Sequence, residues 1–240
     1  MRATLLLAIP ILVCCLFSWA QTPASLPRPE HPEPQFQREE WVSLNGEWEF
    51  GETDVEADAL FLGAQPYPDK IVVPFCRESK LSGLERKGFV KNVWYRRAFS
   101  VPAEWRSPRI LLHIGACDWK TRVWVNGALL CEHVGGYTPI VVDITNVAKR
   151  DAANTVIVHA YDDTRGSLQP TGKQAHEEKS NGCVYTRTTG IWQSVWLEGV
   201  GDAYLREVFV TPDPDNARIV IRAEIAQARP GLQLSATATA

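Results

Sequence analysis

Short runs of alternating hydrophobic and polar residues, separated by turn-forming residues, occupy most of the chain after Trp41. Such alternation is typical of a strand with one buried face, and Gly, Pro and Asn between the runs mark turns. Asn126-Gly127 stands between two apolar runs and predicts a tight hairpin, because both residues tolerate positive φ. The pattern predicts strands within the ranges 44–50, 71–73, 93–101, 109–114, 122–125, 140–144, 155–161 and 194–198.

Helical patterns are scarce in comparison. Residues 53–60 predict one or two helical turns, whereas a βαβ arrangement needs helices of about 10–15 residues between its strands. The chain is therefore predicted to be all-β, with a jelly-roll β-sandwich over residues 38–200. Two more strands are predicted at 204–212 and 217–225, and two strands cannot form a stable domain alone. We therefore expect residues 201–240 to be the incomplete start of a second β-sandwich.

The first residues have the order of a secretory signal: a basic Arg2, an apolar run over 5–17, and then Ser18-Trp19-Ala20. We expect residues 1–20 to be a signal peptide that is removed on export to the periplasm or the exterior, and the alternative is a buried N-terminal strand. The apolar run is too short for a transmembrane helix. Residues 21–37 are rich in proline and predict a linker or an extended lead-in.

The composition is that of a globular protein, with 45% hydrophobic and 22% charged residues among 240. The formal charge of −3 offers no basic field for phosphates, so a nucleic-acid partner is not expected. Four cysteines follow the signal, and their spacing matches no zinc site. In an exported chain they can form disulfides in any of three pairings or remain free buried thiols, and the sequence does not choose between these. They are Cys76, Cys117, Cys131 and Cys183.

No motif for a self-contained active site is present. The sequence has no G-x-S-x-G, H-E-x-x-H or P-loop, and its histidines have no metal-ligand spacing. The carboxylate pairs Asp162-Asp163 and Glu177-Glu178 are interpreted as ordinary loop charges. The tryptophans at 48, 94, 124 and 196 lie on alternating strand patterns, which favours burial over sugar stacking. The residues themselves predict an exported all-β domain with no cofactor and no metal site.

Several short sequence blocks of the chain follow one another in an order that is found in one protein family. Together they resemble the N-terminal sugar-binding domain of family 2 glycoside hydrolases, a group of β-galactosidases, β-glucuronidases and β-mannosidases, over residues 41–200. The blocks are Ser43-Leu44-Asn45-Gly46-Glu47-Trp48, Trp94-Tyr95-Arg96-Arg97, Gly115-Ala116-Cys117-Asp118-Trp119, Val123-Trp124-Val125-Asn126-Gly127, His133-Val134-Gly135-Gly136-Tyr137, Asp143-Ile144-Thr145, and residues 190–198.

The resemblance implies an architecture as well as a function. Family members continue from the jelly roll into an immunoglobulin-like sandwich and then a (β/α)8 barrel with two catalytic glutamates. Residues 201–240 resemble the start of that sandwich, and the chain is expected to be truncated before the barrel and inactive alone. We expect it to support and partly line the active site of the barrel and to contribute to homo-oligomer contacts. The alternatives are a free-standing carbohydrate-binding module and a purely structural scaffold domain.

The resemblance also implies residues that bind substrate. Asn92 matches a position where β-galactosidases of the family present an asparagine to the sugar, although it can also be a turn-forming residue. Family members carry an aspartate six residues before Gly190, where this chain has Val184, which accepts no hydrogen bond. Tyr185 and Arg187 are the nearest replacements. Lys173, in a loop that resembles one in exported members, is a further candidate, with a solvated loop lysine as the alternative.

Overall fold

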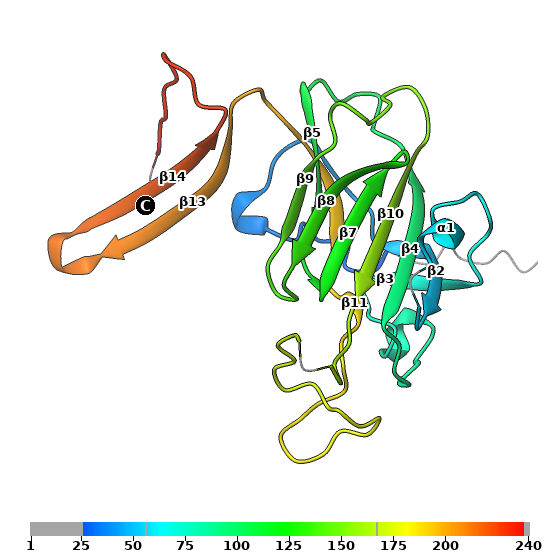
Figure 1. The fold of residues 1–240 in the computed structure, drawn as a ribbon. Helices are drawn as coiled ribbons and strands as arrows, with labels where there is room; N and C mark the ends of the chain where they lie inside the picture. The colour runs from blue at the N-terminus through cyan, green and yellow to red at the C-terminus, as the bar shows by residue number, and fades with distance from the viewer. Residues whose placement is uncertain (1–25, 56, 167, 238–240) are drawn as a thin grey trace, which may run out of the picture.

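The computed structural model describes residues 26–55, 57–166 and 168–237, so the expected signal peptide lies outside the described residues. Two antiparallel sheets pack face to face as a β-sandwich (Figure 1), which confirms the predicted fold class. The larger sheet runs, from edge to edge, through β3 (Asp69–Val73), β2 (Gly46–Thr53), β4 (Asn92–Phe99), β10 (Asn154–Tyr161), β7 (Lys120–Val125) and β8 (Ala128–Val134).

The smaller sheet completes the sandwich, and a short ladder extends it at one end. The four strands of the smaller sheet are, in order, β1 (Trp41–Ser43), β12 (Val195–Val200), β5 (Arg109–Ile114) and β9 (Ile140–Asp143). The short ladder pairs β6 (Cys117–Asp118) with β11 (Gly190–Ile191). In the described part of the chain, helical structure is limited to α1 (Asp58–Phe61) and three 3-10 turns, η1 (Pro34–Phe36), η2 (Lys80–Ser82) and η3 (Pro214–Asn216). Each predicted strand range overlaps one of these strands, and α1 is the helical turn that was expected over residues 53–60.

The strand predicted over 44–50 begins later than expected, and β1, which was not predicted, precedes it. β1 ends at Ser43 and β2 begins at Gly46, and between them the chain crosses from one sheet to the other. Asn45 is 1% exposed at the crossing, and its side chain accepts from Val195 N at 3.0 Å. Gly46 follows with φ +111°, a conformation that favours glycine. Asn45 and Gly46 thus form the point where the chain crosses between the sheets.

The predicted Asn126-Gly127 turn connects β7 to β8. Asn126 has φ 51° and Gly127 has φ 85°, the positive pair that matches the twist of a two-residue hairpin. The Asn126 amide donates to Val147 O at 2.8 Å and accepts from Thr155 N at 3.0 Å, which anchors the turn to its neighbours. The tight hairpin predicted from sequence is confirmed.

We expect Gly127→Ala to lower the free energy of unfolding by about 1 kcal/mol. A Cβ at Gly127 would meet no heavy atom within 4 Å, so the cost comes from the positive φ alone. Gly88→Ala is the matched control, because Gly88 also has open space but no positive φ. Urea denaturation of both variants measures the difference, and equal stability of the two would contradict this account of the turn.

The interior of the sandwich is a single cluster that both sheets contribute to, with Trp48, Phe50 and Tyr95 among its largest side chains. Burial of Trp48, Trp94, Trp124 and Trp196 was predicted and is confirmed. Trp94 and Trp124 nevertheless lie on the outer face of the larger sheet, in a second cluster with Phe61 of α1. Their rings stack with centroids 5.8 Å apart. Period-2 alternation identifies a buried face but does not say which layer covers it.

The described part of the lead-in packs against the outer face of the smaller sheet. His31 is 6% exposed and lies edge-on against Trp41, with ring centroids 4.6 Å apart. Glu198, on the same face, is 1% exposed and accepts hydrogen bonds from Arg38. The nearest ring nitrogen of His113 is 3.2 Å from the Glu198 carboxylate. Burial raises the pKa of Glu198, but the interaction with His113 of β5, followed by Arg38 and Trp196, lowers it overall. The proline-rich residues therefore form an ordered layer on the sandwich.

The last two strands form a separate hairpin of β13 (Tyr204–Asp213) and β14 (Arg218–Ala226), which projects away from the sandwich (Figure 1). Its apolar side chains are exposed, including Val210 at 58% and Ile219 at 56%. That this hairpin begins a second, immunoglobulin-like sandwich, with the boundary near residue 201, stays a prediction.

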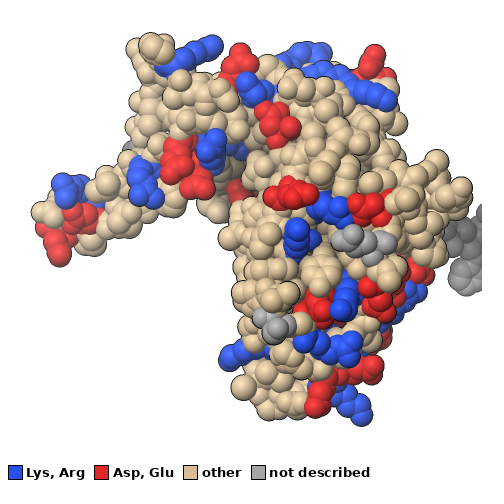
Figure 2. Space-filling view, in the orientation of Figure 1, with Lys and Arg blue, Asp and Glu red and all other residues tan. Residues whose placement is uncertain are grey.

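All four cysteines of the described residues are free thiols. Cys117 is buried, Cys76 and Cys131 are half-buried, and Cys183 is exposed, so burial does not account for all four. Figure 2 shows positive and negative side chains interspersed over the face in view, with no continuous basic stripe. None of the helices among the described residues has the length and apolarity that crossing a bilayer requires.

Candidate functional site

A long loop leaves the sandwich at the end where β10 and β11 meet, and it projects well beyond the strands (Figure 1). We call residues 162–189 the β10–β11 loop, and residues 74–91, which lead from β3 to β4, the β3–β4 segment. Hydrogen bonds join the two: Arg187 donates to Lys87 O, and Thr189 N donates to Glu78 Oε2. Three of the four residues predicted to bind substrate lie in the β10–β11 loop, and Asn92 begins β4 directly after the β3–β4 segment.

Lys173 and Tyr185 are neighbours in the β10–β11 loop, and both side chains are exposed to solvent. Tyr185 N donates to Lys173 O at 2.8 Å, and Ala175 N donates to Tyr185 O at 2.7 Å, which forms a short parallel ladder. The side chain of Tyr185 remains 61% exposed. The ladder therefore holds the backbone of both residues while their amine and phenol groups stay free for a ligand.

Arg187 lies behind this pair and is only 2% exposed. Its guanidinium donates to Glu177 O at 2.7 Å, to Ala175 O at 3.3 Å and to Lys87 O in the β3–β4 segment. It also lies over the Phe89 ring, 3.9 Å from the centroid. Burial lowers the pKa of Arg187 from its ordinary value. Arg187 thus positions the β10–β11 loop, and in this structure its charge faces backbone carbonyls.

A second contact fixes the same loop to the β6–β11 ladder. Gln174 Nε2 donates to Asp118 Oδ2 at 2.9 Å, and Gln174 Oε1 accepts from Thr188 N at 2.8 Å. Gly136 packs against the same carboxyl group so closely that a Cβ there would lie 2.5 Å from Asp118 Oδ1. The amide of Gln174 therefore bridges the two arms of the loop, and only glycine fits beside its partner.

Asn92 lies at the same end of the sandwich but on the other side of the larger sheet. It is 3% exposed, and its Oδ1 is 2.9 Å from His159 Nε2. Its Nδ2 donates to Thr53 O at 3.3 Å. Burial, with Arg122 nearby, lowers the pKa of His159 to about 4, so the ring is neutral at pH 7 and Nε2–H can donate to Asn92. The structure thus brings Lys173, Tyr185 and Arg187 together and places the Asn92 amide away from them.

Three buried carboxyl groups lie at the base of the loop: Glu78, Asp118 and Asp162, with exposures of 4%, 3% and 2%. Burial raises the pKa of Asp118 to about 6 and that of Asp162 to about 7, and it also raises the pKa of Glu78. The interpretation of Asp162-Asp163 as ordinary loop charges is therefore wrong for Asp162, whose Oδ2 has no hydrogen-bond partner. Asp163 does behave as a loop charge, because it pairs with Lys91 at 2.8 Å.

Sequence reasoning missed Glu78, Gln174 and Asp118 as parts of this site. Asp118 stands in one of the blocks that carry the family resemblance, and Gln174 follows Lys173 in the resembling loop, so both had a signal. Glu78 had none, because its role depends on a contact between distant loops. None of the three carboxyl groups is presented to solvent, so their role here is to support the loop. Across the described ranges, no group of three or more His, Cys, Asp or Glu side chains is arranged to hold a metal ion.

Comparison with known proteins identifies the family to which the chain belongs. Residues 17–198 match the family model described as "Glycosyl hydrolases family 2, sugar binding domain". A β-galactosidase of Thermoanaerobacter pseudethanolicus is 28% identical over 121 residues, 50% of this chain and 15% of that protein. A β-glucuronidase of Paenibacillus borealis is 26% identical over 183 residues, 71% of this chain and 31% of that protein. The chain thus spans less than a third of the length of these relatives.

Solved structures share the fold at low sequence identity. A β-glucuronidase from Ruminococcus gnavus, in complex with uronic deoxynojirimycin, superposes with a TM-score of 0.62 and 24% identity, covering 80% of this chain and 35% of that chain. The β-glucuronidase of Faecalibacterium prausnitzii has a TM-score of 0.58 and 22% identity, covering 78% and 36%. These likenesses establish the sandwich architecture.

Proposed function

Since the chain belongs to glycosyl hydrolase family 2 and carries its sugar-binding domain, we propose that it is the N-terminal, non-catalytic part of an exported β-glycosidase. The match over residues 17–198 carries this proposal. The basic and apolar residues of the first twenty positions support export. The chemistry of the whole enzyme would be retaining hydrolysis of a β-glycosidic bond.

Retaining hydrolysis needs two carboxyl groups about 5–5.5 Å apart on either side of the bond. The buried carboxyls of Glu78, Asp118 and Asp162 do not meet this requirement, because no substrate reaches them. We assign both catalytic carboxylates to a barrel domain that works with this one. On this account the chain alone has no turnover, and its own contribution is to position and line part of the substrate site.

The β10–β11 loop is the part that we assign to the substrate. It presents an amine and a phenol, Lys173 and Tyr185, on a backbone that Arg187 and Gln174 hold in place. Both groups can hydrogen-bond to sugar hydroxyls. Val184 replaces the family aspartate beside them, and its backbone N donates to Asn181 O at 3.0 Å. This departure leaves galactosides and glucuronides both as substrates to be tested.

We expect Lys173→Ala and Tyr185→Ala to raise KM for an aryl β-glycoside about fivefold each in the complete gene product that contains this sequence. Each variant removes one hydrogen bond of about 1 kcal/mol to the substrate. Steady-state hydrolysis of the 4-nitrophenyl β-D-glucuronide and β-D-galactoside provides the measurement.

Lys179→Ala is the matched control, since Lys179 is an exposed lysine of the same loop. Its kinetics should equal those of the native enzyme. If all three variants hydrolyse the substrate with unchanged kcat and KM, the loop does not touch the substrate and that part of the proposal is wrong.

A further inference from the structure

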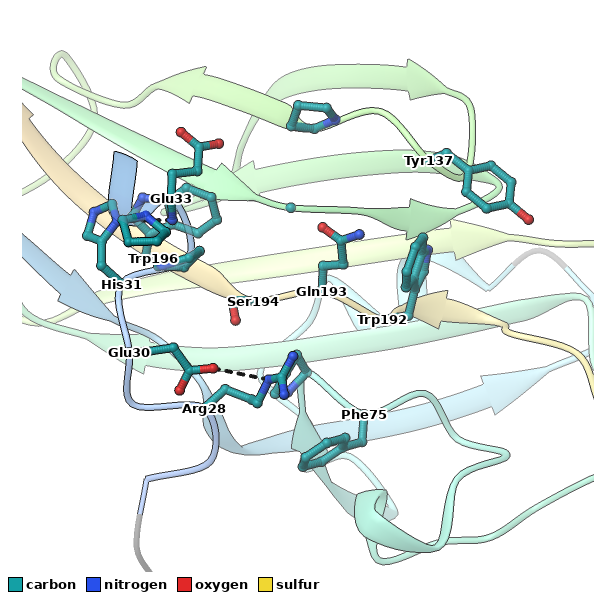
Figure 3. Close-up of a pocket in the computed structure, with 15 residues that line it drawn as sticks. Arg28, Glu30, His31, Glu33, Phe75, Tyr137, Trp192, Gln193, Ser194 and Trp196 are labelled. Carbon is teal, nitrogen blue, oxygen red and sulfur yellow. Dashed lines mark hydrogen bonds and ion pairs between the residues drawn. The ribbon is translucent and has the colours of Figure 1, made fainter. Parts of the chain in front are cut away.

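A pocket of about 660 Å³ lies between the lead-in and the chain that runs from β11 to β12. Its Tyr137 end borders the β10–β11 loop, because a Cβ at Gly172 would lie 3.7 Å from the Tyr137 hydroxyl. This volume is within the range of about 300–1,000 Å³ that is typical of small-molecule sites. In Figure 3, Trp192 and Tyr137 lie at one end of the pocket, His31 and Trp196 lie at the other, and Arg28 and Phe75 face them from below. None of the residues assigned to the β10–β11 loop site lines it.

Two aromatic rings form a rigid end wall. Trp192 Nε1 donates to Gly136 O at 2.8 Å, so the indole is held in one orientation and its nitrogen is already used. Tyr137 packs edge-on against it, with centroids 5.7 Å apart and an interplanar angle of 72°. Tyr137 is nevertheless 70% exposed. A fixed indole beside an exposed phenol offers a pyranose ring an apolar surface for its axial C–H groups and a hydroxyl for hydrogen bonding.

The polar floor of the pocket is also built in advance. Buried Asn45 donates to Ser194 Oγ at 3.0 Å and to the carbonyl of Pro27 at 3.2 Å, which joins the lead-in to the start of β12. Gly115 lies under Gln193 so closely that a Cβ would be 2.9 Å from Gln193 Oε1. The Gln193 side chain is exposed, and its amide can both donate and accept. Because these contacts already hold the lining residues in place, a ligand loses less binding free energy to ordering them.

The charges around the pocket favour a neutral ligand. Arg28 Nε lies 3.3 Å from Glu30 Oε1, so the guanidinium is already paired with a carboxylate. Glu33 adds a second carboxylate to the lining, which leaves the rim with more negative than positive charge. A uronate or phosphate would be repelled there, whereas the hydroxyls of a neutral sugar can bond to both the carboxylates and the guanidinium.

We propose that this pocket binds a neutral hexopyranose unit of a glycan, with the ring stacked on Trp192 and hydroxyls bonded to Gln193 and the Arg28–Glu30 pair. This goes beyond the proposed function, because it is a binding site that needs no hydrolysis and no residue of the β10–β11 loop. It would let the domain hold a glycan chain on its own.

Calorimetric titration of the purified chain with methyl β-D-glucopyranoside tests the proposal. We expect saturable binding that weakens tenfold or more in Trp192→Ala and in Tyr137→Ala. Because Trp192 is half-buried and its removal can affect folding, Gln193→Ala serves as a second variant with an exposed side chain, and thermal melts verify that each variant is folded. Phe209→Ala, a half-exposed aromatic on the distant hairpin, should bind as the native chain does.

The same titration with methyl β-D-glucuronide tests the charge argument, and it should give binding at least tenfold weaker than the glucoside. Lack of saturable binding by the folded native chain would overturn the proposal, and so would binding that Trp192→Ala, Tyr137→Ala and Gln193→Ala all leave unchanged. Equal binding of the glucuronide would overturn the neutral-sugar assignment. Because only binding is measured, failure here leaves the proposed glycosidase function to be judged by hydrolysis.

Discussion

Replacing Arg187 by methionine is expected to release the β10–β11 loop and to lower the free energy of unfolding by about 3–5 kcal/mol. The substitution keeps an unbranched apolar stem but leaves the carbonyls of Ala175, Glu177 and Lys87 without their donor. Each buried carbonyl that loses its hydrogen-bond donor costs about 1–3 kcal/mol, and three such losses account for an effect of this size. The expected result is a large loss of order in the loop together with a lower melting temperature.

Hydrogen exchange measures this effect where it arises. The amides of Ala175 and Tyr185, which are hydrogen-bonded within the loop, should exchange much faster in Arg187→Met. Arg165→Met is the matched control, because Arg165 lies over the same Phe89 ring at 4.1 Å but is exposed. Should both variants show native exchange in the loop, Arg187 would not be its positioning residue.

Replacing Asp162 by asparagine should stabilise the protein at pH 8 by an amount on the order of 3 kcal/mol and change little at pH 4. The pKa of Asp162 is raised to about 7 by burial and by the nearby Asp118 and Glu78 carboxyls. The folded protein therefore retains a proton that the unfolded chain loses at its ordinary pKa near 4. Native stability falls as the pH rises through this interval, and the asparagine variant avoids the loss.

Several contacts indicate that asparagine fits at this position. Gln169 Nε2 donates to Asp162 Oδ1 at 2.6 Å, and an amide oxygen can accept in the same way. The Oδ2 atom that becomes an amide nitrogen has no partner to lose.

Asp163→Asn is the control with the opposite sign. The Lys91 ammonium, 2.8 Å away, lowers the pKa of Asp163, so this carboxylate contributes stability above its unfolded pKa and loses it in acid. Chemical denaturation between pH 4 and pH 8 measures both variants. A pH dependence of Asp162→Asn that parallels the native protein would show that Asp162 titrates normally and that the description of the buried carboxyl group is wrong.

The strands were predictable because each depends on local features. The apolar run in β5, the alternation in β9 and the Asn126-Gly127 turn are readable within a few residues, and the structure places them as expected. The layer that covers each face was not predictable. Trp94 is buried by α1 and Trp196 by the lead-in, and both covers come from distant parts of the sequence.

The candidate site was predictable in part for the same reason. Family position indicated Lys173, Tyr185 and Arg187, which the structure brings into one loop. It also indicated Asn92, whose amide is engaged by His159 on the far side of the sheet. The full burial of Asp162 next to half-buried Asp163 depends on where the sandwich ends, and two adjacent aspartates give no sign of that.

The central claim is that this domain serves a β-glycosidase, and hydrolysis by the complete gene product tests it most directly. The substrates are the 4-nitrophenyl β-D-glucuronide, β-D-galactoside and β-D-mannoside, with the anomeric configuration of the released sugar followed by NMR. The account predicts hydrolysis of at least one of them with retention of configuration, and no turnover by the 240-residue chain alone. A folded complete product that hydrolyses none of the three, or that inverts the anomeric centre, would contradict it.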